Sequence, residues 1–361
     1  MKTLKILDWP EKRFYGESHP FHRWKSEFLA HGLKVEFYTN HLDKRLEDAD
    51  YLLLHSRYFA GGWQHLQTRN TQNEAELISY LQKMNNHTGR LIWFDAADSS
   101  GSSDFPIIPY VDVFLKKQVL KDKRYYTDAN QGRNLRLWLD LLPKNSKTVF
   151  EPCPANQLQK IKIGWNIGFN DYRFFGFKMS RLSNYLNYKI YPPRFSAVVK
   201  KRGLDLTFRG TIHQDQGQLK GISDQRNYIL SLFTQLQLQI ASGHNVSKSR
   251  YWKELRNSKI GLSPFGWGEI CYRDFETFIS GALLVKPLMN HLETFPNLYR
   301  ENETYIPVSW DLLDLEEKLN HLITYYKAHQ DIAAYGQEVY KNAIYDAESF
   351  VQQIEQGIGK I

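Results

Sequence analysis

The residues of this sequence best suited to chemistry lie between Ser263 and Gly281, where two glutamates and an arginine follow a glycine-containing turn. An apolar run, a turn and an amphipathic run predict a strand, a loop and a helix in that order. Backbone N–H groups at the start of such a helix suit phosphate oxygens. Glu269 and Glu276 are seven positions apart, about two helical turns, so both would share one face if both were helical.

These side chains indicate recognition of a ligand that carries both phosphate and hydroxyl groups. A carboxylate such as Glu276 accepts hydrogen bonds from ribose or sugar hydroxyls, and Arg273 can pair with phosphate. Gly268 lies in the turn, where backbone can approach a ligand closely. A plainer interpretation is a surface helix on which Glu269 and Arg273 form a solvated i, i+4 pair. Spacing alone does not favour the binding site over this surface pair.

The segment resembles the donor-binding helix of GT-B glycosyltransferases, especially those of the bacterial glycosyl transferases group 1 type, and the similarity extends over roughly 204–361. The residues that carry it are Arg273, Phe275, Glu276, Gly281 and the apolar strand 283–285. The resemblance implies that Glu276 binds the ribose of a nucleotide sugar. Many retaining relatives carry two glutamates eight positions apart, but here Gly268 stands eight before Glu276 and Glu269 comes one place late. The role of Glu269 and the stereochemical outcome therefore stay open.

Arg209 is the second candidate for the donor site, because it directly follows the first expected strand of the second half, 204–208. A cation there can neutralise the charge that develops on a leaving diphosphate. Lys220 and Arg226 are alternatives for this role. A solvated loop arginine fits the position of Arg209 equally well.

A catalytic base would come from the first half of the chain, at the carboxyl ends of strands. Asp95 and Asp98 follow an apolar run, and either carboxylate could deprotonate an acceptor hydroxyl. Both could instead cap a helix or form a turn, which Asp favours. His22 is a further candidate in the loop after the first strand, as are His19 and His55, although a lone histidine is more often structural.

Short apolar runs alternate with amphipathic helical segments along the whole chain. Such alternation predicts right-handed crossovers and parallel sheets. We therefore predict an α/β protein with two Rossmann-like domains that face each other across a cleft, where ligands bind. The domains would be an acceptor domain over 1–155, an interdomain segment over 156–200, and a nucleotide-sugar donor domain over 201–361. The final helices would pack back on the first domain.

Charge and composition narrow the partners. The chain has 47 Lys and Arg against 39 Asp and Glu, a net charge of +8, which would attract a phosphate-rich partner or an anionic membrane surface. There is no dense basic run, no zinc-finger spacing and no aromatic-basic signature of an RNA-binding sheet, so we expect no nucleic-acid partner. Cys153 and Cys271 lie far apart, which predicts neither a disulfide framework nor a zinc site.

We expect no metal and no cofactor, since the Asp-x-Asp at 48–50 precedes a strand and so lies at the wrong end of the sheet for a ligand. No run approaches the ~20 apolar residues of a membrane span, and the first residues lack the features of a signal peptide. These features predict a cytoplasmic protein, with peripheral contact at the inner membrane face as a further option.

The predicted function is transfer of a sugar from a nucleotide-sugar donor to a glycan or lipid-linked acceptor, in synthesis of cell-surface polysaccharide, lipopolysaccharide or capsule. A GT-B-like epimerase or phosphorylase is a second enzyme hypothesis. The non-enzyme alternative is a GT-B-like protein that binds a nucleotide sugar or glycan without turnover. A Rossmann dehydrogenase is disfavoured, because no Gly-x-Gly-x-x-Gly follows the first strand.

Overall fold

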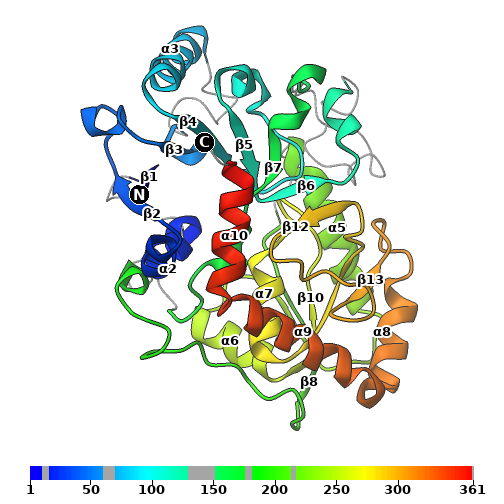
Figure 1. Cartoon of the computed structure of the whole chain (residues 1–361). Coiled ribbons are helices and arrows are strands. Elements are labelled where there is room, and N and C mark those ends of the chain that lie inside the picture. Colours follow the sequence, from blue (N-terminus) through cyan, green and yellow to red (C-terminus); the bar gives the residue numbers. More distant parts are fainter. Residues whose placement is uncertain (10–15, 60–69, 129–150, 175–180, 213–216, 360–361) are drawn as a thin grey trace.

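The computed structural model describes residues 1–9, 16–59, 70–128, 151–174, 181–212 and 217–359. Its elements form two α/β units, each built on a parallel sheet (Figure 1). We call these the first unit and the second unit.

The first unit contains a six-stranded parallel sheet with the strand order β2-β1-β3-β4-β5-β7. Its strands are β1 (Lys2–Leu7), β2 (Leu33–Tyr38), β3 (Tyr51–His55), β4 (Arg90–Asp95), β5 (Val113–Lys116) and β7 (Ile161–Ile163). Helices α1 (His19–Arg23) and α2 (Lys25–Ala30) join β1 to β2, and α3 (Thr71–His87) precedes β4. Every residue of the central strand β3 is buried, which explains the continuous apolar run at 51–54.

The second unit contains a five-stranded parallel sheet with the order β13-β11-β10-β8-β9. Its strands are β8 (Leu204–Arg209), β9 (Ile240–Gly243), β10 (Ser258–Leu262), β11 (Leu283–Pro287) and β13 (Ile306–Val308). Its helices are α5 (Gly217–Phe233), α6 (Lys248–Arg256), α7 (Tyr272–Ser280), α8 (Leu315–Thr324) and α9 (Gln330–Ala343). Two parallel sheets with a cleft between them confirm the predicted fold class of two Rossmann-like units.

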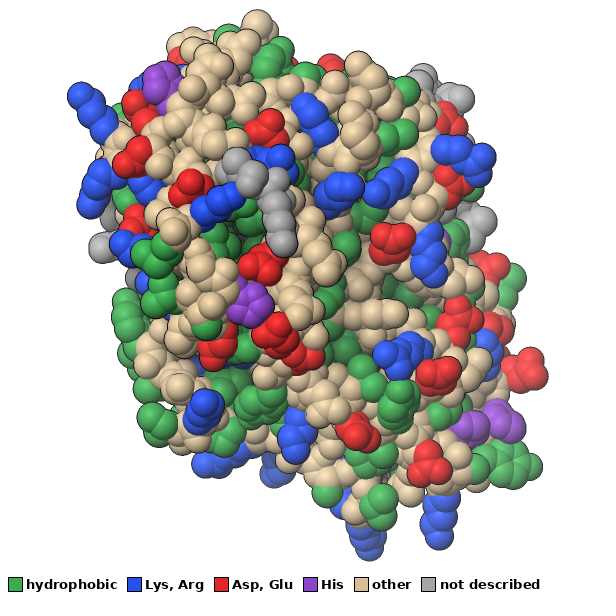
Figure 2. Space-filling view, viewed as in Figure 1, with side chains coloured by type: hydrophobic (Ala, Val, Ile, Leu, Met, Phe, Trp, Pro, Cys, Tyr) green, Lys and Arg blue, Asp and Glu red, His purple; other side chains and the backbone are tan. Residues whose placement is uncertain are grey.

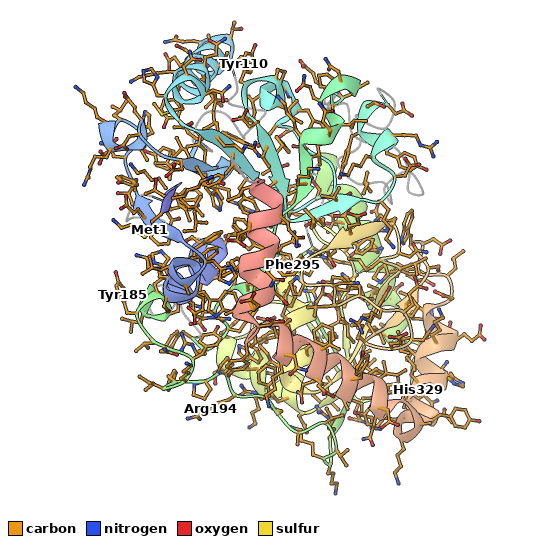
Figure 3. All side chains as sticks on the ribbon, viewed as in Figure 1. Met1, Tyr110, Tyr185, Arg194, Phe295 and His329 are labelled. Carbon is orange, nitrogen blue, oxygen red and sulfur yellow. The ribbon has the colours of Figure 1, made fainter. Side chains whose placement is uncertain are left out.

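The two units are joined by more than the connecting chain. The last helix, α10 (Ala347–Ile358), packs against the first unit, where Phe350 and Ile354 share a core with β1 and β3 (Figure 1). Strand β6 (Gln118–Leu120) pairs antiparallel with β12 (Leu292–Thr294), which follows β11 in the second unit. Phe295, directly after β12, lies beside α10 at this junction (Figure 3). The two units that form the cleft are therefore also joined to each other through α10 and the β6–β12 pair.

Aromatic side chains account for much of the packing between α10 and the first unit. The Phe350 ring contacts several others there, among them Phe21, Trp24, Phe28, Trp165 and Phe169. The indole of Trp165 also stacks on Phe94 of β4, with ring centroids 3.9 Å apart. Much of the aromatic content thus lies in the core, where such rings bury large apolar areas.

In the described ranges no helix is both long and apolar enough to cross a membrane. On the face that carries α10, acidic and basic side chains are interspersed over most of the surface (Figure 2).

Candidate functional site

A cleft of about 530 Å³ lies between the two units. Asp98 and Ile167 line it from the first unit, and residues that follow β8, β9 and β10 line it from the second, together with α7. Carboxyl ends of parallel strands face this cleft from the second unit, as expected for a ligand site in such sheets.

Helix α7 is fixed in place at both ends. At its start the Asp274 carboxylate accepts hydrogen bonds from the backbone N–H of Cys271 (3.1 Å) and from the Tyr299 hydroxyl (2.8 Å), and the buried Lys286 ammonium lies 3.2 Å away. At its end Gly281 adopts a left-handed conformation (φ 61°), which glycine tolerates. Residues 274–280 are all buried. The interpretation of this segment as a solvated surface helix is therefore wrong.

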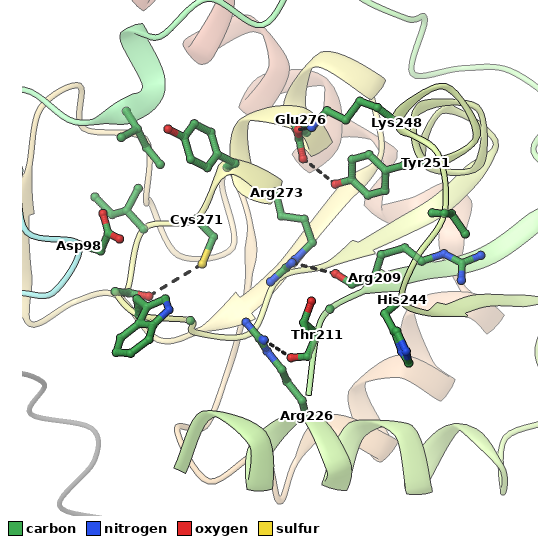
Figure 4. A pocket seen from close by; sticks show the side chains of 18 of the residues that line it. Asp98, Arg209, Thr211, Arg226, His244, Lys248, Tyr251, Cys271, Arg273 and Glu276 are labelled. Atoms are coloured by element: carbon green, nitrogen blue, oxygen red, sulfur yellow. Dashed lines mark hydrogen bonds and ion pairs between the residues drawn. The ribbon is translucent and has the colours of Figure 1, made fainter. Parts of the chain in front are cut away.

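Two arginines of the second unit direct their guanidinium groups into the cleft, Arg226 from α5 and Arg273 from α7 (Figure 4). Arg226 donates to the carbonyl of Thr211, and Arg273 donates to the carbonyl of Arg209 at 3.0 Å. Within the described residues neither forms an ion pair, and the buried Nε of each has no hydrogen-bond partner. The charges of these two arginines are thus not paired with a carboxylate among the described residues.

The electrostatics of this pair favour an anion between the two side chains. Burial lowers the pKa of Arg226, and the neighbouring positive charge of Arg273 lowers it further. Two cations that face each other in a partly desolvated site repel, so an anionic ligand that bridges them is stabilised. A diphosphate can supply oxygens to both guanidinium groups at once.

Arg209, predicted as a donor-binding residue, lines the cleft but its charge is already paired. Its Nε and Nη2 donate to the carboxylate of Glu254 at 2.9 and 2.8 Å. Figure 4 shows its side chain running away from the Arg226–Arg273 pair. Of the two alternatives named with it, Arg226 is one of the cleft cations, and the side chain of Lys220 lies outside the described part of the chain.

Glu276 lies on α7 and forms part of the cleft wall. One carboxylate oxygen accepts from the ammonium of Lys248 at 2.6 Å, and the other accepts from the hydroxyl of Tyr251 at 2.6 Å. Burial and the adjacent Glu276 carboxylate raise the pKa of Tyr251, so the phenol stays a donor. Lys248 and Tyr251 begin α6, and no spacing rule linked them to Glu276, which follows 25 or more positions later.

Gly268 and Glu269 lie at the contact between the units. A Cβ at Gly268 would stand 1.5 Å from the carbonyl oxygen of Asp98, so only glycine fits there. Glu269 is fully buried and accepts from the backbone N–H (2.9 Å) and the hydroxyl (2.6 Å) of Ser100. It precedes α7 and does not share a helical face with Glu276. Gly268 lines the cleft, whereas Glu269 joins the second unit to the first.

Asp98 is the carboxylate that faces the cleft from the first unit (Figure 4). Its side chain is 43% exposed, and Oδ1 accepts from Arg57 (2.9 Å) and from Lys117 (2.8 Å). The half-exposed rings of Trp267 and Tyr272 line the same part of the cleft from the second unit. A carboxylate beside aromatic faces suits the hydroxyls and the apolar face of a sugar.

Asp95 and His22 lie elsewhere, although both were predicted as candidate catalytic groups. Asp95 is fully buried and pairs with the equally buried ammonium of Lys116 at 2.6 Å. His22 stacks on the ring of Phe37 at a centroid distance of 3.6 Å, outside the lining of the cleft.

The two other histidines considered are buried as well. Burial lowers the pKa of His19 to about 3 and that of His55 to about 4, so both are neutral near pH 7. Neither His19 nor His55 lines the cleft. Among the described residues there is no group of three or more His, Cys, Asp or Glu side chains that could hold a metal ion.

We expect the buried Asp95–Lys116 pair to matter for stability. Asp95→Asn leaves the Lys116 ammonium charged in a dry environment, and breaking such a pair costs about 3–5 kcal/mol. The free energy of unfolding, measured by denaturant titration, should fall by that order. The control Asp122→Asn disrupts an exposed pair with Arg124 and should have a much smaller effect. An equal loss in both variants would contradict a special role for the buried pair.

No protein-family model matches the sequence, and no curated protein matches it either. Solved structures do resemble the fold. An α-glucosyltransferase of phage T4 in complex with UDP and DNA has a TM-score of 0.47, with 10% identity over 98% of both chains. HepE from Anabaena in complex with UDP-glucose has a TM-score of 0.46, with 10% identity over 99% of both chains. The DNA-modifying enzyme β-glucosyltransferase has a TM-score of 0.48, with 9% identity over 99% of both chains.

One prediction about partners is corrected by these structures. The prediction that the protein has no nucleic-acid partner rested on the lack of a dense basic run, and this prediction is wrong. Two of the similar structures are DNA-modifying or DNA-bound glucosyltransferases. Nucleic acid therefore stays among the acceptors to be tested. Identities near 10% with TM-scores below 0.5 assign neither a donor nor an acceptor to this chain.

Proposed function

We propose that this chain is a glycosyltransferase that uses a nucleotide-diphosphate sugar. The observation that carries the proposal is the pair Arg226 and Arg273, two cleft cations whose hydrogen bonds within the described residues go only to backbone carbonyls. A diphosphate leaving group gains negative charge as its bond to the sugar breaks. Fixed cations aimed at that charge stabilise the transition state more than the ground state.

The rest of the cleft suits the other parts of such a donor. Glu276 lies on the α6 side, where its carboxylate can accept hydrogen bonds from ribose hydroxyls in place of those from Lys248 or Tyr251. Trp267 and Tyr272 belong to the second unit but lie at the part of the cleft that Asp98 of the first unit faces, and the sugar would extend there. In this proposed order the diphosphate would lie between the ribose and the reacting sugar, as the chemistry of the donor requires.

We propose Asp98 as the group that accepts the proton of the acceptor hydroxyl, since among the described residues it is the carboxylate that lines the cleft from the first unit. Arg57 and Lys117 hold its Oδ1 and so orient the carboxylate. In this scheme residues 1–155 serve the acceptor and 201–361 the donor, joined by 156–200. Closure of the cleft around both substrates would exclude water and favour transfer over hydrolysis.

The acceptor is proposed more coarsely than the donor. Our leading proposal is a glycan or lipid-linked hydroxyl in cell-surface polysaccharide synthesis, and a hydroxylated nucleic-acid base is the acceptor class to test against it. The alternative without catalysis is a protein that binds a nucleotide sugar or glycan and does not turn it over. The same cleft side chains would bind the ligand in an enzyme and in a non-catalytic binding protein, so only a measurement of turnover distinguishes the two.

The test is a thermal-shift screen with UDP, GDP, CMP, ADP and dTDP and their common sugars, followed by product detection with the donor that binds. A selective shift with one nucleotide, together with sugar release or transfer, supports the proposal. A selective shift without any turnover favours the non-catalytic alternative. No shift with any diphosphate would contradict a donor site at Arg226 and Arg273.

Glu276→Gln tests the ribose contact. The substitution keeps the shape of the side chain but removes the charge that accepts hydrogen bonds from hydroxyls, so affinity for the bound nucleoside diphosphate should fall about tenfold. Affinity for its 2′,3′-dideoxy counterpart, measured by calorimetry, should fall less. Equal losses for both nucleotides would mean that Glu276 acts through Lys248 and Tyr251 and does not contact ribose.

A further inference from the structure

The positive charge of this chain is concentrated in the segment that joins its two units. Residues 172–204 contain eight Lys and Arg and no Asp or Glu. The net charge of the whole chain is +8, so acids and bases balance over the remainder. A single segment thus accounts for the excess of basic residues.

Not all of these cations are available to a partner. Arg173 pairs with Asp171 at 2.6 Å, and the buried Arg202 donates to backbone carbonyls such as that of Ser258 at 2.8 Å. The side chains of residues 178 and 181 lie outside the described part. Four cations remain that are exposed and form no ion pair in that part of the chain: Lys189, Arg194, Lys200 and Lys201.

The same segment exposes large apolar side chains. Tyr185 is 86% exposed, Ile190 84% and Val199 77%. Figure 3 shows Tyr185 and Arg194 at the outer margin of the molecule, away from α10. Exposed apolar residues that stand singly are ordinary, so it is their combination with the exposed cations of the same segment that singles out this surface.

Buried contacts hold this segment in a defined conformation. The Tyr188 ring lies under the guanidinium groups of Arg23 (4.1 Å) and Arg173 (4.3 Å). The buried Ser183 hydroxyl lies 3.3 Å from Nδ1 of His19 on α1. Residues that alternate with these anchors, such as Tyr185 and Ile190, are therefore turned outward by the fold.

We propose that the junction patch, made of Tyr185, Lys189, Ile190, Arg194, Val199, Lys200 and Lys201, docks this protein on an anionic lipid bilayer. The cations are attracted to headgroup phosphates, and the apolar side chains enter the interface between headgroups and acyl chains. Nucleic acid matches the cations but offers no comparable apolar phase for Ile190 and Val199. Combined charge and aliphatic exposure favour the lipid surface. This proposal stands independently of glycosyl transfer.

The test is flotation of the full chain with vesicles of phosphatidylcholine alone and of phosphatidylcholine with phosphatidylglycerol. We expect binding to the anionic vesicles only, weakened by salt. The double variants Tyr185→Ser/Ile190→Ser and Lys200→Gln/Lys201→Gln should each reduce the partition coefficient about tenfold or more. The Tyr185→Ser/Ile190→Ser variant keeps all the cations of the patch, so its remaining binding should depend on salt as strongly as that of the unchanged protein. The binding of the Lys200→Gln/Lys201→Gln variant should depend on salt less.

Matched controls come from other parts of the surface. Leu42→Ser/Leu313→Ser removes side chains that are 72% and 74% exposed, and Lys253→Gln/Lys327→Gln removes the same charge as the patch variant. Both controls should bind vesicles like the unchanged protein, and thermal unfolding should show all variants folded. Absence of vesicle binding, or equal binding of patch and control variants, would overturn the proposal. The proposal would also be overturned if the protein bound a fluorescent DNA oligonucleotide tightly through the patch and did not bind vesicles.

Discussion

Replacing either Arg226 or Arg273 by Gln should lower kcat/KM for sugar transfer by about 10²–10³. Each guanidinium reaches into the cleft without a described carboxylate to neutralise it, so each is free to stabilise charge on a departing diphosphate. Steady-state kinetics with the donor found by the nucleotide screen measures this loss. Calorimetry should show weaker binding of the nucleoside diphosphate and little change for the corresponding nucleoside.

Arg250→Gln is the matched control for these two substitutions. Arg250 lies on α6, its side chain is 67% exposed, and it donates to the same Glu254 that pairs with Arg209. It does not line the cleft, so kcat/KM should stay within about twofold. The double variant Arg226→Gln/Arg273→Gln should lose less than the two single losses combined, because both groups act on one anion. Unchanged diphosphate affinity in both single variants would remove the central support for the donor site.

The strands could be predicted well where both faces of a sheet are covered. Runs such as 51–54 and 283–285 are continuously apolar because β3 and β11 are buried throughout, and such runs stand out in a sequence. The three-residue strands β6 and β12 were not predicted. They are too short for a pattern of alternation, and they exist because each is the pairing partner of the other across the junction.

The donor helix could be located from the sequence, but the roles of individual residues there could not. Ser100, the partner of Glu269, is 169 positions away, and Glu254, the partner of Arg209, is 45 positions away. Ion pairing and burial decide which charged residue remains available to a ligand, and both depend on such distant contacts. Local spacing therefore identified the cations near the cleft without showing that Arg209 is already neutralised.

Asp95 and Asp98 show that local sequence does not reveal the role of a charged residue even when two candidates are three positions apart. Asp95 is the last residue of strand β4 and Asp98 follows three positions later, yet Asp95 points into the core beside Lys116, while Asp98 reaches the cleft. The course of the chain after β4 decides this difference, and the loop around Asp98 is held by contact with Gly268 and Gln118 of other elements. The sequence could place a carboxylate at the end of this strand but could not choose between the two.

Asp98→Asn should lower kcat by roughly 10²–10⁴, the usual contribution of a positioned general base. The amide keeps a similar shape but cannot accept the acceptor's proton. Affinity for the nucleoside diphosphate should not change, because the cations proposed to hold it belong to the second unit. The control Asp122→Asn changes an exposed carboxylate of the first unit that pairs with Arg124, away from the cleft, and should leave kcat unchanged.

The pH profile separates a base from a group that only positions the acceptor. A base must be ionised, so kcat/KM of the unchanged protein should fall as pH is lowered through the titration of that group. In Asp98→Asn this acidic limb should disappear while residual activity remains. A limb that persists in the variant would transfer the role of base to another group. Activity within about twofold of the unchanged protein would exclude Asp98 from proton transfer, since a positioned base typically contributes about 10²-fold or more.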